Sequence, residues 1–370
     1  MAYIHETPDW PHFRWNADAF EAALADVHVA RGRLHGRLDA LGLRGATDDH
    51  GAANVEADAI ASAAIEGERL DPAEVRSSVA RRLGLDTAGL PAPSRTVDGF
   101  VATLIDATRH ANAPLDTERL HRWHHDLFPE GTHTIDAAHI GRWRPEAGDP
   151  MRVVSGPIGR ERVHFVAPSA SRIASEMHAF LAWFEGGAPP RDAVVRSGVA
   201  HLWFLTIHPY EDGNGRLARA IADLTIARGD ARTDRAFSLS AQVAADRRAY
   251  YLALERQQSA SLDITPWLSW WVACVGRAVA AAMTSLNNTV ARAAAWAHLE
   301  RLGLNDRQRR VISRVLDGFQ GNLTTAKYAA MARCSTDTAL RDLQGLVAAG
   351  VVTPTGGRGR AAAYRITEPN

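Results

Sequence analysis

Residues 208–219 read His-Pro-Tyr-Glu-Asp-Gly-Asn-Gly-Arg-Leu-Ala-Arg and join two apolar segments of helical pattern, 194–207 and 217–227. Gly213 and Gly215 let the backbone turn where side chains would clash. The turn opens into a helix, whose first N–H groups have no partner within the helix and therefore attract phosphate. The stretch predicts a phosphate-binding loop between two helices.

Side chains of three kinds in this loop suit nucleotide chemistry. Arg216 and Arg219 lie three residues apart, so both can hold phosphate oxygens at one end of the helix. Asp212 suits Mg²⁺, which prefers oxygen ligands, and His208 can accept a proton near neutral pH. The alternative is a polar loop with a surface arginine pair. A lone glycine turn would favour that alternative, and the complete run argues against it.

The stretch resembles the Fic motif, His-Pro-Phe-x-Asp/Glu-Gly-Asn-Gly-Arg-x-x-Arg, and departs from it only at Tyr210, which replaces phenylalanine. Tyrosine keeps the ring that packs into a core and adds a hydroxyl that needs a partner. The resemblance implies a mainly α-helical Fic core with a β-hairpin flap. It also implies that His208 is the catalytic base, which deprotonates a Ser, Thr or Tyr hydroxyl of a target protein so that this hydroxyl takes AMP from ATP.

By the same resemblance, the loop binds ATP and Mg²⁺. Asp212 would hold the metal, Asn214 would reach the α-phosphate, and the two arginines would bind the outer phosphates. The nucleotide contacts expected in the loop are Asp212, Gly213, Asn214, Gly215, Arg216, Leu217, Ala218 and Arg219. Tyr250 or Tyr251 is a further candidate to line the adenine pocket, with Tyr250 favoured, although an aromatic pair on an amphipathic helix is more often part of the core.

A second motif, Ser62-Ala-Ala-Ile-Glu66-Gly67, lies in an alanine-rich segment of helical pattern. Ser62 and Glu66 share one helix face, and Gly67 suits the end of a helix. Alone, this motif is an ordinary helix end with an exposed glutamate. Together with the Fic motif, it resembles the inhibitory motif of self-restrained Fic proteins, which implies regulatory roles for Ser62, Glu66 and Gly67.

In that family the inhibitory glutamate pairs with the second arginine of the Fic motif, here Arg219. Glu66 would thereby block the productive pose of the ATP γ-phosphate, so it is also expected at the nucleotide site. In some members the same glutamate aligns a water that removes AMP from modified targets. Both directions of the reaction therefore stay open.

Residues 152–168 contain two β-rich runs around a Gly/Pro turn, which predicts a hairpin in an otherwise helical chain. The hairpin resembles the Fic flap, which lies over the active site and pairs with a target segment by strand addition. The expected nucleotide contacts in the flap are Val153, Val154, Ser155 and Gly156. His164 is expected to be a solvated side chain, and an incidental hairpin is the alternative.

The composition indicates which classes of binding partner and which cell compartment fit this chain. Acidic and basic residues balance at 42 each, so no overall charge points to nucleic acid or a membrane. The sequence contains no leader pattern and no apolar run of membrane-spanning length, which predicts a cytoplasmic protein without a membrane partner. Cys274 and Cys334 lie far apart without metal-ligating neighbours, which argues against a disulfide framework and a zinc site.

The chain of 370 residues is long enough for several domains. We expect an N-terminal helical region at 1–95, which contains the inhibitory helix at about 58–68. A Fic catalytic core at 96–285 and a winged helix-turn-helix domain at 286–370 would follow. The last domain is predicted from three helical segments, at 306–316, 324–332 and 336–349. Two strand-like runs follow, at 351–353 and 361–366.

Two interpretations of the last domain stay open. As a DNA reader, it would place Thr336, Thr338 and Arg341 in the major groove, with Arg358 and Arg360 against the backbone or in the minor groove. As an interaction module, it would present targets to the Fic site or help two copies of the chain associate.

The sequence thus favours a protein adenylyltransferase that is restrained by Glu66 and has ATP and a hydroxyl-bearing target protein as partners. The alternative is a transcription regulator that senses ATP through the Fic core and binds DNA through the last domain. A different donor nucleotide also fits, because a phosphate cradle does not identify the base. The target protein and the formation of a homodimer stay open.

Overall fold

A computed structural model describes residues 3–43, 49–129, 136–146, 150–156, 160–187, 189–230, 236–301, 303–316, 323–356 and 363–366. The chain divides into two compact units, Met1–Ala282 and Met283–Asn370. The first unit contains both the residues predicted as an N-terminal region and those predicted as the catalytic core. Within the described residues, no helix is both long enough and apolar enough to cross a lipid bilayer.

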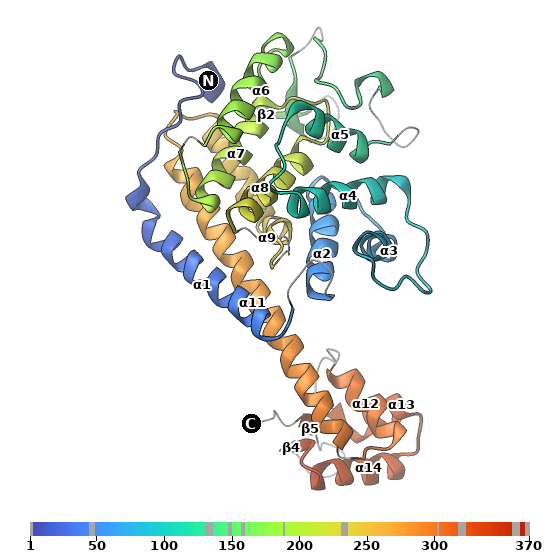
Figure 1. Cartoon of the computed structure of the whole chain (residues 1–370). Coiled ribbons are helices and arrows are strands. Elements are labelled where there is room, and N and C mark those ends of the chain that lie inside the picture. The colour runs from blue at the N-terminus through green and yellow to red at the C-terminus, as the bar shows by residue number, and fades with distance from the viewer. Residues whose placement is uncertain are drawn as a thin grey trace. The chain divides into compact units, whose positions relative to one another are not determined.

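The first unit is mainly α-helical, as the Fic resemblance implies (Figure 1). Short 3₁₀ segments lie at Ile4–Glu6, Ala17–Ala19 and Ala137–His139. The α-helices are α1 Glu21–Ala40, α2 Asp49–Ile65, α3 Pro72–Leu83, α4 Arg95–Arg109, α5 Thr117–Leu127, α6 Ala170–Glu185, α7 Ala193–Ile207, α8 Asn214–Asp230, α9 Leu239–Ala245, α10 Arg247–Gln258 and α11 Thr265–Arg301, which continues into the second unit.

Helices α7 and α8 form the centre of the first unit. Almost every residue of α7 is buried, and so are residues 216–226 of α8, which is typical of helices that lie inside a domain. The side chain of Asp192 caps α7 by accepting hydrogen bonds from the N–H groups of Val194 and Val195. Gly198 lets α7 approach α11, because a Cβ at this position would lie 2.8 Å from the ring of Trp271. This close packing fixes the two ends of the loop between α7 and α8.

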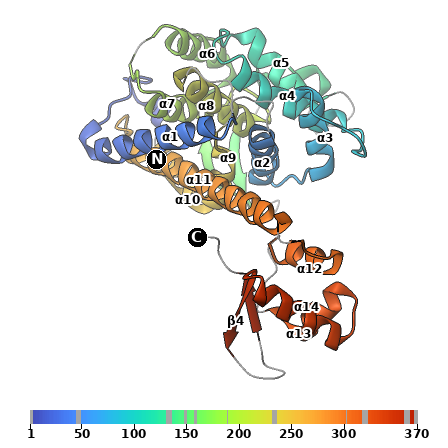
Figure 2. The same ribbon diagram turned by 60° about the horizontal axis from the view of Figure 1, so that its bottom comes forward.

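Helix α1 lies along α11 in both views of the chain (Figures 1 and 2). Gly276 marks the close approach, since a Cβ there would lie 3.1 Å from Cγ2 of Val27. Val27, Leu34 and Leu38 are buried along the same helix. The N-terminal helix therefore packs as part of the first unit.

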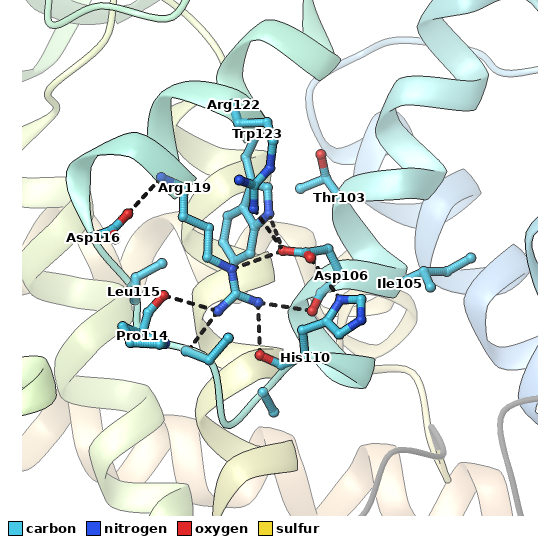
Figure 3. A network of polar contacts seen from close by, with 12 residues as sticks. Thr103, Ile105, Asp106, His110, Pro114, Leu115, Asp116, Arg119, Arg122 and Trp123 are labelled. Carbon is cyan, nitrogen blue, oxygen red and sulfur yellow. Dashed lines mark hydrogen bonds and ion pairs between the residues drawn. The ribbon is translucent and has the colours of Figure 1, made fainter.

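Helices α4 and α5 are joined by an ion pair between the buried Arg119 and the half-buried Asp106, shown in Figure 3. The guanidinium Nε of Arg119 and the indole N–H of Trp123 both donate to Oδ2 of Asp106, at 2.9 and 2.7 Å. The other guanidinium N–H groups donate to main-chain carbonyls of Asp106, His110, Ala113 and Pro114. Arg119 thereby joins the end of α4 and the segment before α5, and fixes α5 against α4.

The predicted hairpin is confirmed. Strands β1 (Arg152–Ser155) and β2 (Arg162–Val166) pair antiparallel, with Val153 opposite Phe165 and Val154 opposite Val163. Phe165 is buried and anchors the hairpin, whereas Val154 and Val163 are exposed. Part of the predicted Gly/Pro turn, at 157–159, lies outside the described residues.

The second unit contains the predicted helices and strands of the last domain. Its elements after α11 are α12 Asp306–Leu316, β3 Leu323–Thr324, α13 Thr325–Ala332, α14 Thr336–Ala348, β4 Val352–Gly356 and β5 Ala363–Ile366. The strands form an antiparallel sheet in the order β3-β5-β4. Ser335 caps α14, since its hydroxyl accepts from the N–H of Thr338. The predicted basic residues Arg358 and Arg360 lie outside the described residues.

We expect Arg119→Met to lower the free energy of unfolding by about 3 kcal/mol, because it removes a buried guanidinium that pairs with Asp106 and donates to four main-chain carbonyls. Denaturant unfolding measures this loss. Arg122→Met is the matched control, since Arg122 lies 3.8 Å from the same carboxylate but its side chain is 53% exposed. The control is expected to lose about 0.5 kcal/mol or less. Equal losses in the two variants would contradict this account.

Candidate active site

The loop between α7 and α8 begins at His208 in a left-handed conformation, with φ 52° and ψ 59°. Such a conformation is uncommon for residues other than glycine and needs support from its surroundings. The N–H of His208 donates to the carbonyl of Phe204 at 3.0 Å, and the guanidinium of Arg144 donates to the carbonyl of His208 at 2.8 Å. The N–H of Arg144 also donates to the carbonyl of Pro209. Nothing in the sequence pattern had marked Arg144, which holds the start of the loop.

The imidazole of His208 is oriented for work as a base. Its Nδ1 lies 3.3 Å from the carbonyl oxygen of Leu205, which can only accept, so the neutral ring carries its proton on Nδ1. The lone pair of Nε2 is then left for another proton. Burial lowers the pKa of His208 to about 4, and the nearby charge of Arg144 acts in the same direction. His208 is therefore neutral at pH 7.

Tyr210 fixes the middle of the loop. Its N–H donates to Oδ1 of Asn214 at 3.0 Å, and the amide of Asn214 donates back to the carbonyl of Tyr210 at 2.8 Å. The buried ring stacks on His124 with centroids 4.1 Å apart. The extra hydroxyl finds a partner in Nδ1 of His121, at 3.0 Å. Asn214 thus holds the loop through both ends of its amide, and its contact with an α-phosphate stays a prediction.

The two arginines of the loop are almost completely buried, with side chains 3% and 1% exposed for Arg216 and Arg219. Arg216 lies over the ring of Phe128, 4.8 Å from its centroid. Within the described residues, Nε and Nη2 of Arg216 and Nη1 of Arg219 have no hydrogen-bond partner. Buried donors of this kind are costly unless an acceptor reaches them. They indicate a place for anionic oxygens beside the start of α8.

The two glycines of the loop are required by close contacts. Gly213 has φ 80°, and a Cβ there would lie 2.8 Å from the ring of Phe128. A Cβ on Gly215 would overlap the carboxylate of Glu66, which lies at the first turn of α8. An anion is favoured at this place by the helix dipole and by free N–H groups. Glu66 therefore lies where the sequence predicts phosphate.

The nucleotide contacts expected of Leu217 and Ala218 stay predictions, and the structure describes how these residues pack. Both are completely buried in α8, so their side chains belong to the core and do not reach a ligand. The N–H of Leu217 donates to the carbonyl of Gly213 at 3.0 Å. The sequence motif includes these positions because they lie between the two arginines, and the helix turns them inward.

The end of α2 contacts Arg219 through both residues of the second motif. Nε of Arg219 donates to the hydroxyl of Ser62 at 2.8 Å, and Nη2 donates to the carbonyl of Ser62 at 3.0 Å. Nη2 also contacts Oε1 of Glu66 at 2.8 Å, so the predicted ion pair is present. Gly67 follows with φ 85° and ends the helix. The regulatory effect of this contact stays a prediction.

A cavity of about 860 Å³ connects the loop, the flap and α10. His208, Gly215 and Glu66 line it, so the candidate base and the start of α8 border one space. The predicted flap residues Val153, Val154 and Ser155 line it as well. Gly156, the fourth predicted flap contact, is absent from its wall, because it lies at the start of the turn.

Tyr250 and Tyr251 both line the cavity, with different surroundings. Tyr250 is 2% exposed and its hydroxyl contacts Nε2 of the buried His201 at 2.9 Å, which fits the core alternative. Tyr251 is 39% exposed, and its hydroxyl donates to the carbonyl of Ile65 at the end of α2. Tyr251 is therefore the more exposed of the two cavity-lining tyrosines, and the contact of Tyr250 with an adenine stays a prediction.

His164 is a structural contact of the flap, which corrects the expectation of a solvated side chain. Its ring lies 2.6 Å from the hydroxyl of Ser155 and 3.0 Å from Oε2 of Glu255 on α10. Arg162 donates to the other oxygen of Glu255 at 2.6 Å. The flap is thereby tied to α10. No local pattern marks Glu255 as the partner, because it lies 91 residues after His164.

Asp212 is the candidate metal ligand. Its side chain is 48% exposed, and Oδ1 accepts from the N–H of Gly213 at 2.6 Å. Within the described residues, no three His, Cys, Asp or Glu side chains come together as a metal site. One carboxylate still fits Mg²⁺, which keeps several waters and takes phosphate oxygens as ligands. Asp212 therefore suits a metal that arrives with a phosphorylated substrate.

Comparison with known proteins gives one family for the site. The model of the Fic/DOC family matches residues 114–226, and a domain of unknown function (DUF4172) matches residues 3–85. The fold is similar to a Fic family protein from Desulfovibrio desulfuricans, at 20% identity and TM-score 0.50, over 94% of this chain and 97% of that one. Fic-1 from C. elegans is similar at 18% identity and TM-score 0.50, over 74% of each chain. No curated protein matches the chain.

The buried histidines of this unit predict a loss of stability in acid. Burial lowers the pKa values of His124, His201 and His208 to about 4, about 3 and about 4. The unfolded chain takes up these protons near pH 6.5, so the free energy of unfolding is expected to fall from pH 6.5 towards pH 4. The slope is up to about 1.4 kcal/mol per histidine and pH unit.

Urea unfolding at pH 7, 6 and 5 measures this slope. His124→Gln keeps a polar side chain and removes one titrating group, so it is expected to reduce the slope by the share of one histidine. An unchanged slope in that variant would contradict the assignment.

Proposed function

The chain belongs to the Fic/DOC family through residues 114–226, and we propose that it is a protein adenylyltransferase whose resting form is restrained by Glu66. The reaction transfers AMP from ATP to a Ser, Thr or Tyr hydroxyl of a target protein. One observation carries the proposal most directly. The neutral imidazole of His208 and Gly215, at the start of α8, line one cavity whose size suits a nucleotide. In the same turn of α8, buried nitrogens of Arg216 and Arg219 have no hydrogen-bond partner within the described residues.

Each of these residues has its own role in the proposed reaction. Nε2 of His208 accepts the proton of the target hydroxyl, whose oxygen then bonds to the α-phosphorus of ATP. The bond from the α-phosphorus to the bridging oxygen breaks, and pyrophosphate leaves. Arg216, Arg219 and the N–H groups at the start of α8 stabilise the charge on the outer phosphates. A Mg²⁺ held by Asp212 supplies further positive charge to the phosphates.

Glu66 restrains this site through charge and space. Its carboxylate uses Nη2 of Arg219, which the ATP γ-phosphate needs in the productive pose. It also occupies the place beside Gly215 where the start of α8 favours an anion. A carboxylate and a phosphate repel each other there, so productive binding requires that Glu66 moves away.

We expect Glu66→Gly to raise labelling of host proteins by about tenfold or more. A tenfold gain in affinity for ATP corresponds to about 1.4 kcal/mol. The assay incubates the chain with labelled ATP, Mg²⁺ and host lysate. Glu66→Gly/His208→Ala is expected to label nothing, because the base is gone. If Glu66→Gly labels no better than wild type, the restraint is wrong. If the double variant labels as well as Glu66→Gly, the base assignment is wrong.

The donor nucleotide and the direction of reaction are tested with the same Glu66→Gly variant. Unlabelled ATP is expected to compete with the label, and CTP, GTP or UTP at equal concentration is not. Removal of AMP is tested by adding wild-type chain and Mg²⁺ to the labelled targets, where loss of label would indicate that Glu66 aligns a water.

A second function is proposed for residues 283–370, namely DNA binding by a winged helix-turn-helix. The order of elements α12, β3, α13, α14, β4 and β5 supports it, with α14 as the recognition helix. Thr336 and Arg341 are exposed on α14, whereas Ala339 and Leu343 are buried against the core of this unit. In a transcription regulator, ATP bound at the Fic site would change the affinity for DNA.

We expect the chain to bind duplex DNA at about 50 mM salt and to lose affinity as salt rises, because phosphate contacts release counterions. Arg341→Ala is expected to weaken binding by about tenfold through loss of a base contact. Arg33→Ala, at an exposed arginine of α1, is the control and should bind as wild type does. A wild-type chain that does not bind DNA at low salt ends this proposal.

A further inference from the structure

The turn after α2 carries two carboxylates, and each contacts a different arginine of α8. Oε1 of Glu66 lies 2.8 Å from Nη2 of Arg219, as described above. Oε2 of Glu68 lies 3.0 Å from Nη1 of Arg216, the other arginine of the phosphate cradle. The sequence motif contains Glu66 alone, and Glu68 has no part in the function described so far.

The backbone of the turn explains how both carboxylates reach α8. The N–H groups of Glu66 and Glu68 both donate to the carbonyl of Ala63, at 3.0 Å each, and the N–H of Gly67 donates to Ala64 at 3.1 Å. Bonds of this pattern, around a glycine with positive φ, reverse the chain at a helix end. The residues before and after Gly67 therefore both face the start of α8.

The contact with Glu68 matters because Arg216 is buried. The side chain of Arg216 is 3% exposed, and a buried guanidinium is costly without a negative partner. Asp212 lies 3.8 Å away, beyond hydrogen-bond distance, and is the more exposed carboxylate, at 48% against 42% for Glu68. Glu68 is thus the carboxylate that forms a hydrogen bond with Arg216.

We propose that Glu68 is a second restraining carboxylate, which holds Arg216 as Glu66 holds Arg219. The inference rests on the proposed nucleotide site. The outer phosphates of ATP must then displace two carboxylates, one from each arginine. Loss of Glu66 alone leaves Nη1 of Arg216 occupied. Because the two carboxylates lie two residues apart in one turn, a movement of that turn withdraws both together.

The test measures the dissociation constant of ATP with Mg²⁺ by calorimetry on the full chain. All variants carry His208→Ala, so that ATP is bound without being consumed. Glu68→Gln and Glu66→Gln are each expected to tighten binding about three- to tenfold, as for partly buried ion pairs, and the double variant more than either. Glu118→Gln, at an exposed glutamate of α5, is the matched control and is expected to bind as the parent does.

Glutamine keeps an amide oxygen within reach of Arg216, so the fold is expected to be retained, which thermal unfolding checks. Glu68→Asp keeps the charge with a shorter reach and is expected to fall between the parent and Glu68→Gln. If Glu68 is only a structural partner, Glu68→Gln lowers the unfolding temperature and leaves the affinity for ATP unchanged, and the inference is wrong.

The outcomes separate this inference from the proposed function. If Glu66→Gln tightens binding and Glu68→Gln does not, the second restraint is wrong and the nucleotide site stands. If Glu68→Gln tightens binding while Glu66→Gly labels no protein, the adenylyltransferase proposal is wrong and the second restraint stands. If neither the parent nor any variant binds ATP, both are wrong.

Discussion

The buried guanidinium of Arg219 is the constraint on which the site depends. A charge with 1% of its side chain exposed needs a partner, and the groups around it are mostly neutral. Burial and the charge of Arg219 both lower the pKa of His201, to about 3. Burial raises the pKa of Asp223 to about 8, although the charge of Arg219 acts in the opposite direction. At pH 7 the imidazole is neutral and the Asp223 carboxyl is mainly protonated. The negative partner of Arg219 is therefore Glu66, which ties α2 to α8.

Pairing with carboxylates satisfies only some of the hydrogen-bond donors of Arg216 and Arg219. Two nitrogens of Arg216 and one of Arg219 have no hydrogen-bond partner within the described residues, even with both carboxylates in place. A site with unpaired buried donors gains more from a ligand that carries several oxygens than from one carboxylate per arginine. The buried donors of the two arginines thus explain why the resting form is stable with the carboxylates in place. They also explain why a ligand with several oxygens can displace those carboxylates. The start of α8 favours negative charge in either case.

Much of the fold follows from local signals in the sequence. Pro209 and the glycines of the loop separate α7 from α8, Asp192 and Ser335 cap helices, and alternating residues with a Gly/Pro turn make the flap hairpin. The individual contacts are less predictable. Leu217 and Ala218 belong to the motif but point into the core, and the phase of α10 exposes Tyr251 rather than Tyr250. Helix phase depends on which face meets the rest of the protein, which neighbouring residues alone do not reveal.

The sequence by itself determined which groups the loop carries: a histidine, a small-residue turn, and two arginines on one helix end. It also identified Glu66 as the residue to meet Arg219. Only the tertiary structure decided that Arg144 supports His208, that His164 ties the flap to Glu255, and that Glu68 meets Arg216. Glu68 and Arg216 are 148 residues apart in the chain. A contact over such a separation depends on how helices pack, whereas turns, caps and side-chain chemistry are set by neighbouring residues.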